Sequence, residues 1–598
     1  RNLPSAPIIS AYVDKSSEVW FEQEEPGVVV HFNPITGILK REQIRVEPTA
    51  ADRSRPSFHI HEDTNGYLWV HPYGGGFSFY RKEQCLVPFY DELGSSDWRF
   101  SNKIHSTFSD KQGNLWICTH SKGLEKVTFR SVQFSMLTPE EHSYESLSNE
   151  VRALCEDKHK NIWVGLKDGR LRVYDANHKY LGFLTETGNV SLSGVPMKGT
   201  VYDITQDSKG VLWIATKGDG LVRAESVAPN GLSYKLSRYR YDEDDMYSLS
   251  NDNVYCVYED HNGRIWVATF ANAINYISKD KAGNTIFVNH RNNLKGYPID
   301  LCYKTRFITD NNGHLWVGTT AGAVAFDENF KTPEEIQFHH FSRNPNDAKS
   351  LSNNDVHWII ATKKKELYLA TFGGGLNKLL SIDKNGNGVF KSYSVLDGLP
   401  SDVLLSIRED QKQNLWMSTE NGISKFIPGE ERFENYDDRS ITFRVRFSEA
   451  ASAVTSKGKM LFGASNGIFM FDPDSINKSR FVPPIVLSKL VIANQDIVPG
   501  AGSLKVGLDD TKELVLSHKE NIFAIQYAAL DYTNPQNIQY AYILEGFEHQ
   551  WTYADRLRNA TYTNLPKGHY TFKVRSTNSD GVWVDNTRFL DIVVLPSF

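Results

Sequence analysis

The chain has 598 residues, enough for several domains, and its 40% hydrophobic and 12% aromatic residues are typical of a globular protein rich in β-structure. The net charge of −6 and the pI near 6.3 exclude a general basic field for nucleic acid or an anionic membrane. The sequence has no run of 18 apolar residues, so no transmembrane helix is predicted. The opening RNLPSAPIIS is not a signal peptide, so we expect a removed leader or a chain that begins inside a longer protein.

A polar turn followed by a short strand with an aromatic residue recurs along the chain. In the clearest copy, DNNGHLW, the turn covers Asp310 to Gly313, with Gly313 free to adopt a positive φ. We interpret the aspartate as a turn residue that accepts backbone N–H bonds. The aromatic positions lie 46 to 53 residues apart, in ten copies: Trp20, Trp69, Trp116, Trp163, Trp213, Trp266, Trp316, Tyr368, Trp416 and Phe462. A period this regular predicts a repeat architecture.

Each period carries four short strands, which predicts one β-propeller blade per period, with the Trp of the second strand packed against the next blade. A β-helix does not fit this period, because its rungs are shorter. SLSN segments such as Ser248–Asn251 precede the first strand, and Gly-rich turns such as Gly373–Gly375 precede the third. These turns are not phosphate loops, since no helix follows them.

The repeats predict two propeller regions. Residues 1–128 hold three copies, too few to close a ring, and we expect the C-terminal blades of an incomplete first propeller. Residues 129–480 hold seven copies and predict a complete seven-bladed propeller, whose last blade would take its outer strand from residues 132–137. A single ten-bladed ring is the poorer alternative.

The pattern changes after residue 480. Alternating segments such as IFAIQYAAL and IQYAYIL, separated by turn signals, predict an immunoglobulin-like β-sandwich over residues 481–598. The fold class is therefore all-β: a seven-bladed propeller preceded by part of a second one and followed by a sandwich.

Metal and cofactor sites are not predicted. Four of the five cysteines lie in or beside predicted strands without metal-ligand spacing, and we interpret them as buried core thiols; the five are Cys85, Cys118, Cys155, Cys256 and Cys302. No histidine cluster has metal spacing either.

Catalytic propeller chemistry is not supported by the motifs. Sialidase-type aspartate boxes place Asp five residues before Trp, whereas the offset here is six, and the blade count and motif do not fit quinone-dependent dehydrogenases. A glycosidase or lyase needs a placed pair of carboxylates or a base, and no pair stands out from the turn positions. No catalytic residue is predicted.

The propeller units resemble those in the sensor regions of hybrid two-component systems from gut Bacteroidetes, and the sandwich resembles the three-tyrosine (YYY) domain that follows them. The sandwich resemblance rests on QYAALDYTNP (Gln526–Pro535), YAYILEGFEHQW (Tyr540–Trp551), ATYTNLPKGHYTFKVRSTNSDGVW (Ala560–Trp583) and VLPSF (Val594–Phe598). The chain departs from that family by having too few blades for the first ring.

This resemblance implies the periplasmic region of an inner-membrane sensor that binds glycan-derived oligosaccharides and controls polysaccharide-utilisation genes. It also implies a membrane helix after the C-terminus, a histidine kinase outside this chain and a homodimer formed through the sandwich and membrane-proximal region. The region itself would then be no enzyme and would bind no nucleic acid. A propeller glycoside hydrolase or lyase and a protein-binding scaffold remain the alternatives.

The candidate ligand site lies where the loops that lead into the innermost strands gather around the propeller axis. At equivalent places in these loops we expect seven ligand-binding residues: Arg152, Tyr202, Tyr255, Lys304, His357, Trp358 and Arg446. Aromatic rings stack on sugar faces and charged groups bind hydroxyls and carboxylates, and the cations favour an acidic sugar. A second candidate is the pair Trp98 and Arg99 in the partial propeller, which could face a junction between rings.

Overall fold

The computed structural model describes residues 7–597 except positions 26, 44–58, 65, 72–77, 81–85, 89–103, 120–122, 130–132, 141–146, 438–440 and 442–444. The all-β class predicted from the sequence is confirmed: strands dominate this part of the chain, and its one α-helix is the single turn α1 (Ile299–Cys302). No described helix is long and apolar enough to cross a membrane. The chain divides into two compact units, Val132–Asn477 and the combination of Arg1–Ser131 with Lys478–Phe598.

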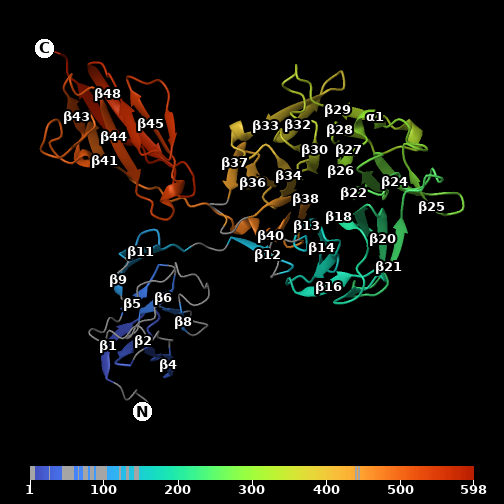
Figure 1. Cartoon of the computed structure of the whole chain (residues 1–598), viewed down its shortest axis with the longest axis horizontal. Helices are drawn as coiled ribbons and strands as arrows, with labels where there is room; N and C mark the ends of the chain where they lie inside the picture. The colour runs from blue at the N-terminus through green and yellow to red at the C-terminus, as the bar shows by residue number, and fades with distance from the viewer. Residues whose placement is uncertain are drawn as a thin grey trace. The chain divides into compact units, whose positions relative to one another are not determined.

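The unit Val132–Asn477 forms a ring, and its described residues make seven antiparallel sheets around a central axis (Figure 1). The first three sheets are β13 (Val151–Glu156), β14 (Ile162–Leu166), β15 (Leu171–Tyr174), β16 (Tyr180–Leu184), β17 (Val190–Ser191); β18 (Thr200–Gln206), β19 (Leu212–Lys217), β20 (Leu221–Ser226), β21 (Tyr234–Tyr239); and β22 (Val254–Glu259), β23 (Ile265–Thr269), β24 (Ile274–Lys279), β25 (Thr285–Val288).

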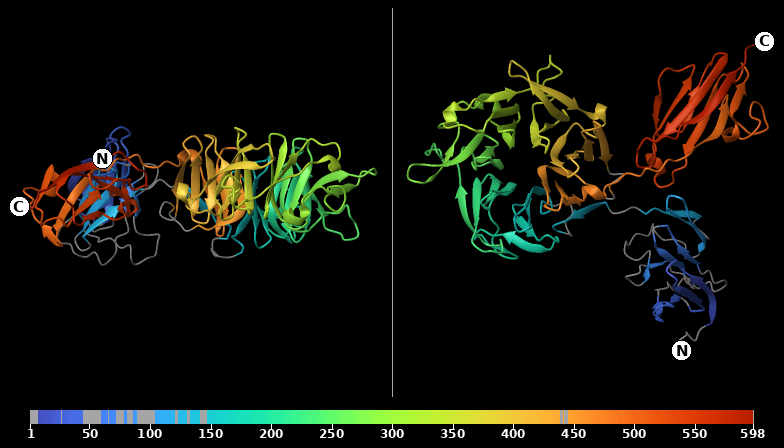
Figure 2. Two further views of the ribbon diagram at one scale, coloured as in Figure 1. Left: turned by 90° about the horizontal axis from the view of Figure 1, so that it is seen from above. Right: turned by 180° about the vertical axis from the view of Figure 1, so that it is seen from behind.

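Three further sheets continue the ring in chain order. They are β26 (Thr305–Asn311), β27 (His314–Thr319), β28 (Gly322–Asp327), β29 (His339–Phe341); β30 (Val356–Ala361), β31 (Leu367–Thr371), β32 (Leu376–Ile382), β33 (Gly388–Tyr393); and β34 (Leu404–Glu409), β35 (Leu415–Thr419), β36 (Gly422–Ile427), β37 (Arg432–Tyr436). In each sheet the first strand in sequence is innermost, and the innermost strands of neighbouring sheets lie side by side (Figures 1 and 2).

The seventh sheet joins the two ends of the unit. It consists of β38 (Phe447–Val454), β39 (Met460–Ala464), β40 (Gly467–Phe471) and, as its outermost strand, β12 (Phe134–Leu137). β12 pairs antiparallel with β40, from Phe134 opposite Phe471 to Leu137 opposite Ile468. Closing the ring in this way leaves no open sheet edge between its first and last parts.

The recurring aspartate and tryptophan form one hydrogen-bonded unit. In a typical copy, Asp260 Oδ1 accepts the N–H groups of Asn262 and Arg264, and Asp260 Oδ2 accepts the indole N–H of Trp266 at 2.9 Å. The bond to the indole recurs at 2.8–2.9 Å in seven copies, from Asp14, Asp63, Asp110, Asp157, Asp207, Asp260 and Asp410. The interpretation of these aspartates as turn residues is confirmed, and the bond explains the six-residue offset.

Several buried tryptophans also connect neighbouring sheets. The Trp266 ring lies 5.2 Å from Phe326 of the next sheet, and Trp416 lies 4.8 Å from Phe471 of the next. The same end of the ring is tied in several sheets by a turn N–H that bonds an acceptor at the end of the next innermost strand, as from Ser208 to Glu259 at 2.7 Å. The bond from Ser456 to Glu156 at 2.9 Å joins the last sheet to the first.

The clearest sequence copy departs from this pattern. β26 runs on to Asn311, and a two-residue turn at Asn312 (φ 54°) and Gly313 (φ 79°) joins it to β27. Asn-Gly favours this two-residue type I′ hairpin, so the loop N–H groups that would bond Asp310 are absent. The turn therefore begins at Asn312 and not, as predicted, at Asp310. The prediction that Asp310 accepts backbone N–H bonds of the turn is also wrong.

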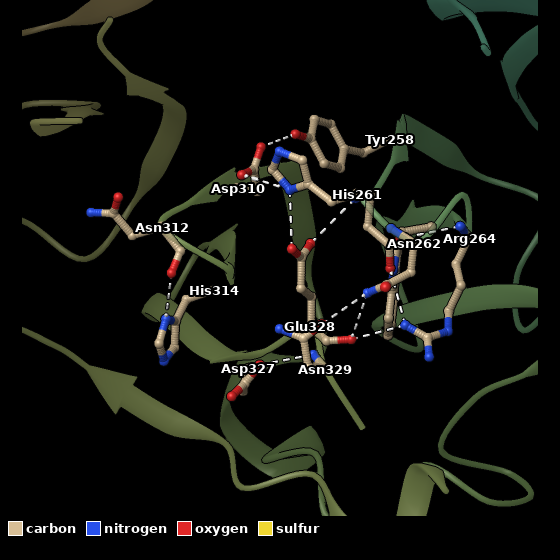
Figure 3. Close-up of polar contacts among 12 residues, drawn as sticks. Tyr258, His261, Asn262, Arg264, Asp310, Asn312, His314, Asp327, Glu328 and Asn329 are labelled. Atoms are coloured by element: carbon tan, nitrogen blue, oxygen red, sulfur yellow. Dashed lines mark hydrogen bonds and ion pairs between the residues drawn. The ribbon is translucent and has the colours of Figure 1, made fainter. Parts of the chain in front are cut away.

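Asp310 contacts the preceding sheet instead (Figure 3). Its carboxylate accepts a hydrogen bond from the Tyr258 hydroxyl and lies 3.3 Å from His261 Nδ1. Glu328, which is buried, lies 3.0 Å from the same nitrogen and accepts the His261 N–H at 3.4 Å. Glu328 thus supplies the acceptor that the shortened turn cannot. Trp316 stacks on Phe341 of its own sheet, 5.0 Å away, and shares a buried cluster with Val356 and Leu369 of the next sheet, as the sequence predicts.

The other unit begins with three sheets that belong to the first three repeats. They are β1 (Ile8–Val13), β2 (Val19–Gln23), β3 (Val28–Phe32), β4 (Leu39–Gln43); β5 (His59–Glu62), β6 (Leu68–His71), β7 (Ser78–Tyr80), β8 (Leu86–Pro88); and β9 (Ile104–Ser109), β10 (Leu115–Thr119), β11 (Leu124–Val127).

The C-terminal part of that unit has two sheets with one hydrophobic core between them. One contains β41 (Ile485–Ile492), β42 (Gln495–Ile497), β44 (Phe523–Ala529), β47 (Asn559–Tyr562), and the other contains β43 (Glu513–Leu516), β45 (Tyr540–Glu545), β46 (Thr552–Asp555), β48 (Gly568–Ser576), β49 (Arg588–Val594). Tyr527 and Tyr540 lie 5.2 Å apart in this core, and the Tyr540 hydroxyl accepts the Ala529 N–H at 3.0 Å.

The cysteines only partly follow the prediction. Cys256 and Cys302 are buried, Cys155 is half-buried, and Cys118 is exposed. Strand β10 places successive side chains on opposite faces, and Cys118 lies on its exposed face between buried Ile117 and Thr119. The buried-thiol interpretation is therefore wrong for Cys118, and Cys85 lies outside the described residues.

Candidate functional site

Six innermost strands of the ring carry a β-bulge at the same place. The pairing register slips by one residue between Val151 and Ala153 in β13, and the slip recurs at the start of β18, β22, β26, β30 and β34. The residues at the bulge are Arg152, Tyr202, Tyr255, Arg306, His357 and Leu405. In β38 the irregularity is longer, from Phe447 to Ser452. A bulge re-aims a side chain out of the regular alternation, so these residues form one set.

Four of these side chains make a continuous row with one neighbour, Phe270. The Arg152 guanidinium lies 5.6 Å from the Tyr202 ring, and the Tyr202 and Tyr255 rings lie 4.9 Å apart, nearly perpendicular. Tyr255 stacks on Phe270 at 4.8 Å, and the Arg306 guanidinium lies 5.4 Å from Phe270. We call Arg152, Tyr202, Tyr255, Phe270 and Arg306 the aromatic row.

The row continues into a charged group. Arg306 Nε donates to Asp355 at 3.0 Å, and Asp355 lies 3.5 Å from His357 Nε2. Burial raises the pKa of the Asp355 carboxyl, but the contact with His357 and the charge of Arg306 outweigh this effect, and the pKa is lowered overall. His357 stacks on Phe372 at 4.9 Å. Asp355 is thus held as a carboxylate between the Arg306 guanidinium and the His357 imidazole.

Two lysines flank the aromatic row. Lys217 Nζ lies 5.7 Å from the Tyr202 ring, and Lys304 Nζ lies 5.4 Å from the Phe270 ring and 5.5 Å from the Tyr303 ring. The other cations of this face have carboxylate partners: Arg152 and Lys167 each lie 3.1 Å from Glu150. Among the described residues, neither Lys217 nor Lys304 has an ion pair.

A cavity of about 640 Å³ lies along the axis, lined by residues of all seven innermost strands. Arg408 donates from Nε to Ser452 Oγ at 3.0 Å, and its guanidinium lies 4.8 Å from the Trp358 ring. Asp203 accepts the N–H groups of Ile204 and Val257 at 2.9 and 2.8 Å. Burial raises the pKa of Asp203 to about 6, although the Arg408 charge opposes it.

Burial shifts the pKa values of several groups that line the cavity. Burial lowers the pKa of Arg408 to about 10 and raises the pKa of the Cys155 thiol to about 12. Cys256 is also thiol, with its pKa raised by burial first and by the Asp203 charge second. No group of His, Cys, Asp and Glu side chains within the described ranges has the arrangement of a metal site.

The structure places four of the predicted residues at the bulges, and Lys304 lies beside the aromatic row. Arg152, Tyr202 and Tyr255 belong to the aromatic row, and His357 is the bulge residue of β30. The prediction that Lys304, Trp358 and Arg446 occupy the equivalent place is wrong. The strand register places Arg306 at the bulge of β26 and His357 at the bulge of β30. Lys304 lies two residues before Arg306, Trp358 is a buried residue of the axial cavity, and Arg446 is an exposed residue that precedes β38. Trp98 and Arg99 lie outside the described residues.

A counting rule would have found the residues that the sequence analysis missed. The bulge residue stands eleven positions before the repeat aromatic, as Tyr255 does before Trp266. In the sheet with the shortened turn the distance is ten, from Arg306 to Trp316. The bulge residue also contacts the residue four positions after the aromatic, as Tyr255 contacts Phe270. The same rule gives Lys217 beside Tyr202.

Comparisons with known proteins bear on this site. The model of the two-component regulator propeller matches residues 99–121, 146–168, 197–218 and 248–271, and that of the Y_Y_Y domain matches residues 531–595. The chain carries two-component regulator propeller repeats and a Y_Y_Y domain. Three of the four matched propeller segments contain a bulge residue of the aromatic row.

A curated relative matches most of the chain at low identity. A protein of Formosa agariphila named Histidine kinase P4 is 24% identical over 507 residues, which are 83% of this chain and 31% of that protein. The chain therefore spans about a third of the length of the curated relative that it matches.

Two solved structures are similar to this chain, and the first supports its fold. The extracellular domain assigned to the hybrid two-component system BT3049 of B. thetaiotaomicron is 23% identical, with a TM-score of 0.69 over 98% of this chain and 73% of that one. The extracellular domain assigned to BT4673 of B. thetaiotaomicron is 19% identical, with a TM-score of 0.43 over 100% of this chain and 76% of that one.

Proposed function

We propose that this chain is the ligand-sensing region of a two-component sensor histidine kinase and that its ligand is a glycan-derived oligosaccharide. The regulator propeller repeats and the Y_Y_Y domain support the sensor role, as do relatives named as a histidine kinase and as the extracellular domain of a hybrid two-component system. The kinase itself would lie outside these 598 residues.

The aromatic row is the observation that carries the ligand proposal. Tyr202, Tyr255 and Phe270 form a run of rings, bordered by guanidinium groups at both ends. Saccharides bind proteins through such combinations, because ring faces contact their C–H surfaces and charged donors bond their oxygens. Burial, and then the neighbouring Tyr202, raises the pKa of Tyr255, so its hydroxyl is a donor at neutral pH.

The location and the output of the sensor are part of the proposal. The chain would lie in the periplasm, with a membrane helix after its C-terminus, and pair as a homodimer through the sandwich. Ligand binding would change the arrangement of the two sandwiches and thereby the transcription of polysaccharide-utilisation genes. A ligand shifts such an equilibrium only by the difference in its affinity for the two arrangements.

We propose binding and no catalysis by this region. A hydrolase or lyase at the aromatic row would need an acid or base poised near neutral pH, whereas the pKa of Asp355 is lowered and its carboxylate is paired. Turnover of an oligosaccharide by the pure chain, lost on replacing Asp355, would overturn this part. A protein-binding scaffold, the remaining alternative, predicts a protein partner and no affinity for sugars.

Calorimetric titration of the whole chain against a panel of neutral and acidic oligosaccharides tests the proposal. We expect at least one ligand to bind and Tyr202→Ala to weaken it about tenfold or more, which is about 1.4 kcal/mol. The control is Tyr247→Ala, because Tyr247 is an exposed tyrosine whose carbonyl accepts the N–H of Phe287 in the outermost strand β25. Equal losses in both variants, or no binding by the wild-type chain, would contradict the proposal.

A further inference from the structure

We infer that the ligand of the aromatic row is an acidic saccharide, whose carboxylate or sulfate groups bind Lys217 and Lys304. This inference rests on the proposed saccharide-binding function and specifies its chemical class. It starts from the ion pairs of this face.

Ion pairs account for the other charges next to the row. Glu150 lies 3.1 Å from both Arg152 and Lys167, while Asp355 and Glu449 lie 3.0 and 3.9 Å from Arg306. Arg152, Lys167 and Arg306 are therefore paired with carboxylates, whereas Lys217 and Lys304 lie against aromatic rings and have no ion pair among the described residues.

Nearby carboxylates that could neutralise these lysines have other partners. Asp219, two residues after Lys217, pairs with Arg240 at 2.7 Å. Asp252 precedes Asn253, the backbone partner of Lys217, and accepts the N–H of Tyr241 at 2.7 Å. Within the described part of the face, neither lysine ammonium donates a hydrogen bond to a protein acceptor.

The positions of the lysines suit a ligand with spaced negative charges. Each ammonium is positioned by an aromatic ring, Lys217 by Tyr202 and Lys304 by Phe270, so neither depends on a carboxylate for its orientation. The rings between them, from Tyr202 through Tyr255 to Phe270, form the interval that the ligand would cover.

Four oligosaccharides of similar length distinguish the sources of negative charge: oligogalacturonate with carboxylates, κ-carrageenan oligosaccharide with sulfates, chondroitin sulfate with both, and neutral maltotetraose. We expect at least one acidic probe to bind the whole chain tenfold or more tighter than maltotetraose. That affinity should fall as salt rises, because the contacts are ionic and partly exposed.

Variants locate the charge effect. The double variant K217A/K304A should lose tenfold or more of the affinity for the acidic probe, and K217R/K304R should keep most of it. The control K384A changes an exposed lysine in the β32–β33 hairpin and should bind as the wild type does. Unchanged affinity in K217A/K304A, or equal affinity for maltotetraose, would overturn this inference while leaving a Tyr202-dependent site intact. If the wild-type chain bound none of the four saccharides, the proposed function itself would be overturned.

Discussion

The two ends of each innermost strand in the ring differ in what they repeat. At the end of the strand, four sheets of the ring, like the three sheets that precede it in the chain, carry the same aspartate and the same bond to a tryptophan. At the start of the strand, six sheets of the ring carry the same bulge, but its residue is Arg, Tyr, Tyr, Arg, His or Leu. The turns at the strand ends repeat both the backbone geometry and the side chains, as expected of residues that stabilise the fold. The bulges at the strand starts repeat the backbone geometry but differ in their side chains, as expected of residues that form a binding surface.

The largest expected effect comes from removing an aspartate of the constant end. Asp260→Ala leaves the buried indole N–H of Trp266 and two turn N–H groups without an acceptor, and we expect a loss of about 3 kcal/mol in the free energy of unfolding. Chemical denaturation measures this loss. The matched control is Asp280→Ala, an exposed aspartate that bonds the N–H groups of Ala282 and Asn284 but no tryptophan. An equal loss in both variants would show that the indole bond is unimportant.

A second prediction concerns the pH dependence of stability from Asp203. Burial raises its pKa from 3.8 to about 6 in the fold, so the stability present with the protonated acid is lost as pH rises through about 6. Asp203→Asn lacks this titration. The difference in the free energy of unfolding between the variant and the wild type should therefore shift in favour of the variant by up to about 3 kcal/mol from pH 4 to pH 8. The lost backbone hydrogen bond lowers the stability of the variant by the same amount at every pH and does not change this shift. Parallel stability curves for the two proteins over this range would contradict the assignment.

The exceptional sheet sharpens the comparison with a smaller effect. Asp310 bonds Tyr258 and contacts His261 but bonds no tryptophan, so Asp310→Ala should cost about 1 kcal/mol, less than Asp260→Ala does. Denaturation of the two variants under identical conditions gives the order. If Asp310→Ala is the more damaging substitution, its contact with the neighbouring sheet matters more than the turn bond does.

The smallest effect concerns thiol reactivity and leaves stability unchanged. Iodoacetamide should modify exposed Cys118 in the native chain, whereas Cys155, whose pKa burial raises to about 12, should react only after unfolding. Peptide mass spectrometry with and without denaturant identifies the modified sites. Native modification of Cys155 at the rate of Cys118 would show that the axial cavity is open to the reagent.

Local sequence signals predicted the constant end of the strands well. The Asp and Trp of each copy belong to one turn and one strand, so their spacing is visible in a short window. Asp310 shows the limit of this reasoning, because Asn312-Gly313 selected a shorter hairpin that was hidden inside the best-looking copy.

The variable end was less predictable for a physical reason. A bulge is set by the register between two strands, and no single residue marks it. Lys304 and Trp358 were therefore chosen by loop position, whereas register selects Arg306 and His357. Tyr255 lies at the start of β22 and Phe270 directly after the end of β23, so their stacking depends on the pairing of these two strands.

Amide hydrogen exchange of the whole chain, with and without the tightest-binding saccharide of the panel, tests the division between the two ends most directly. Protection should appear at the bulged starts of β13, β18, β22 and β26 and around Lys217 and Phe270, while the turns at Asp157, Asp207 and Asp260 stay unchanged. Protection confined to those turns, or absent from the bulged segments while the ligand is bound, would contradict the account.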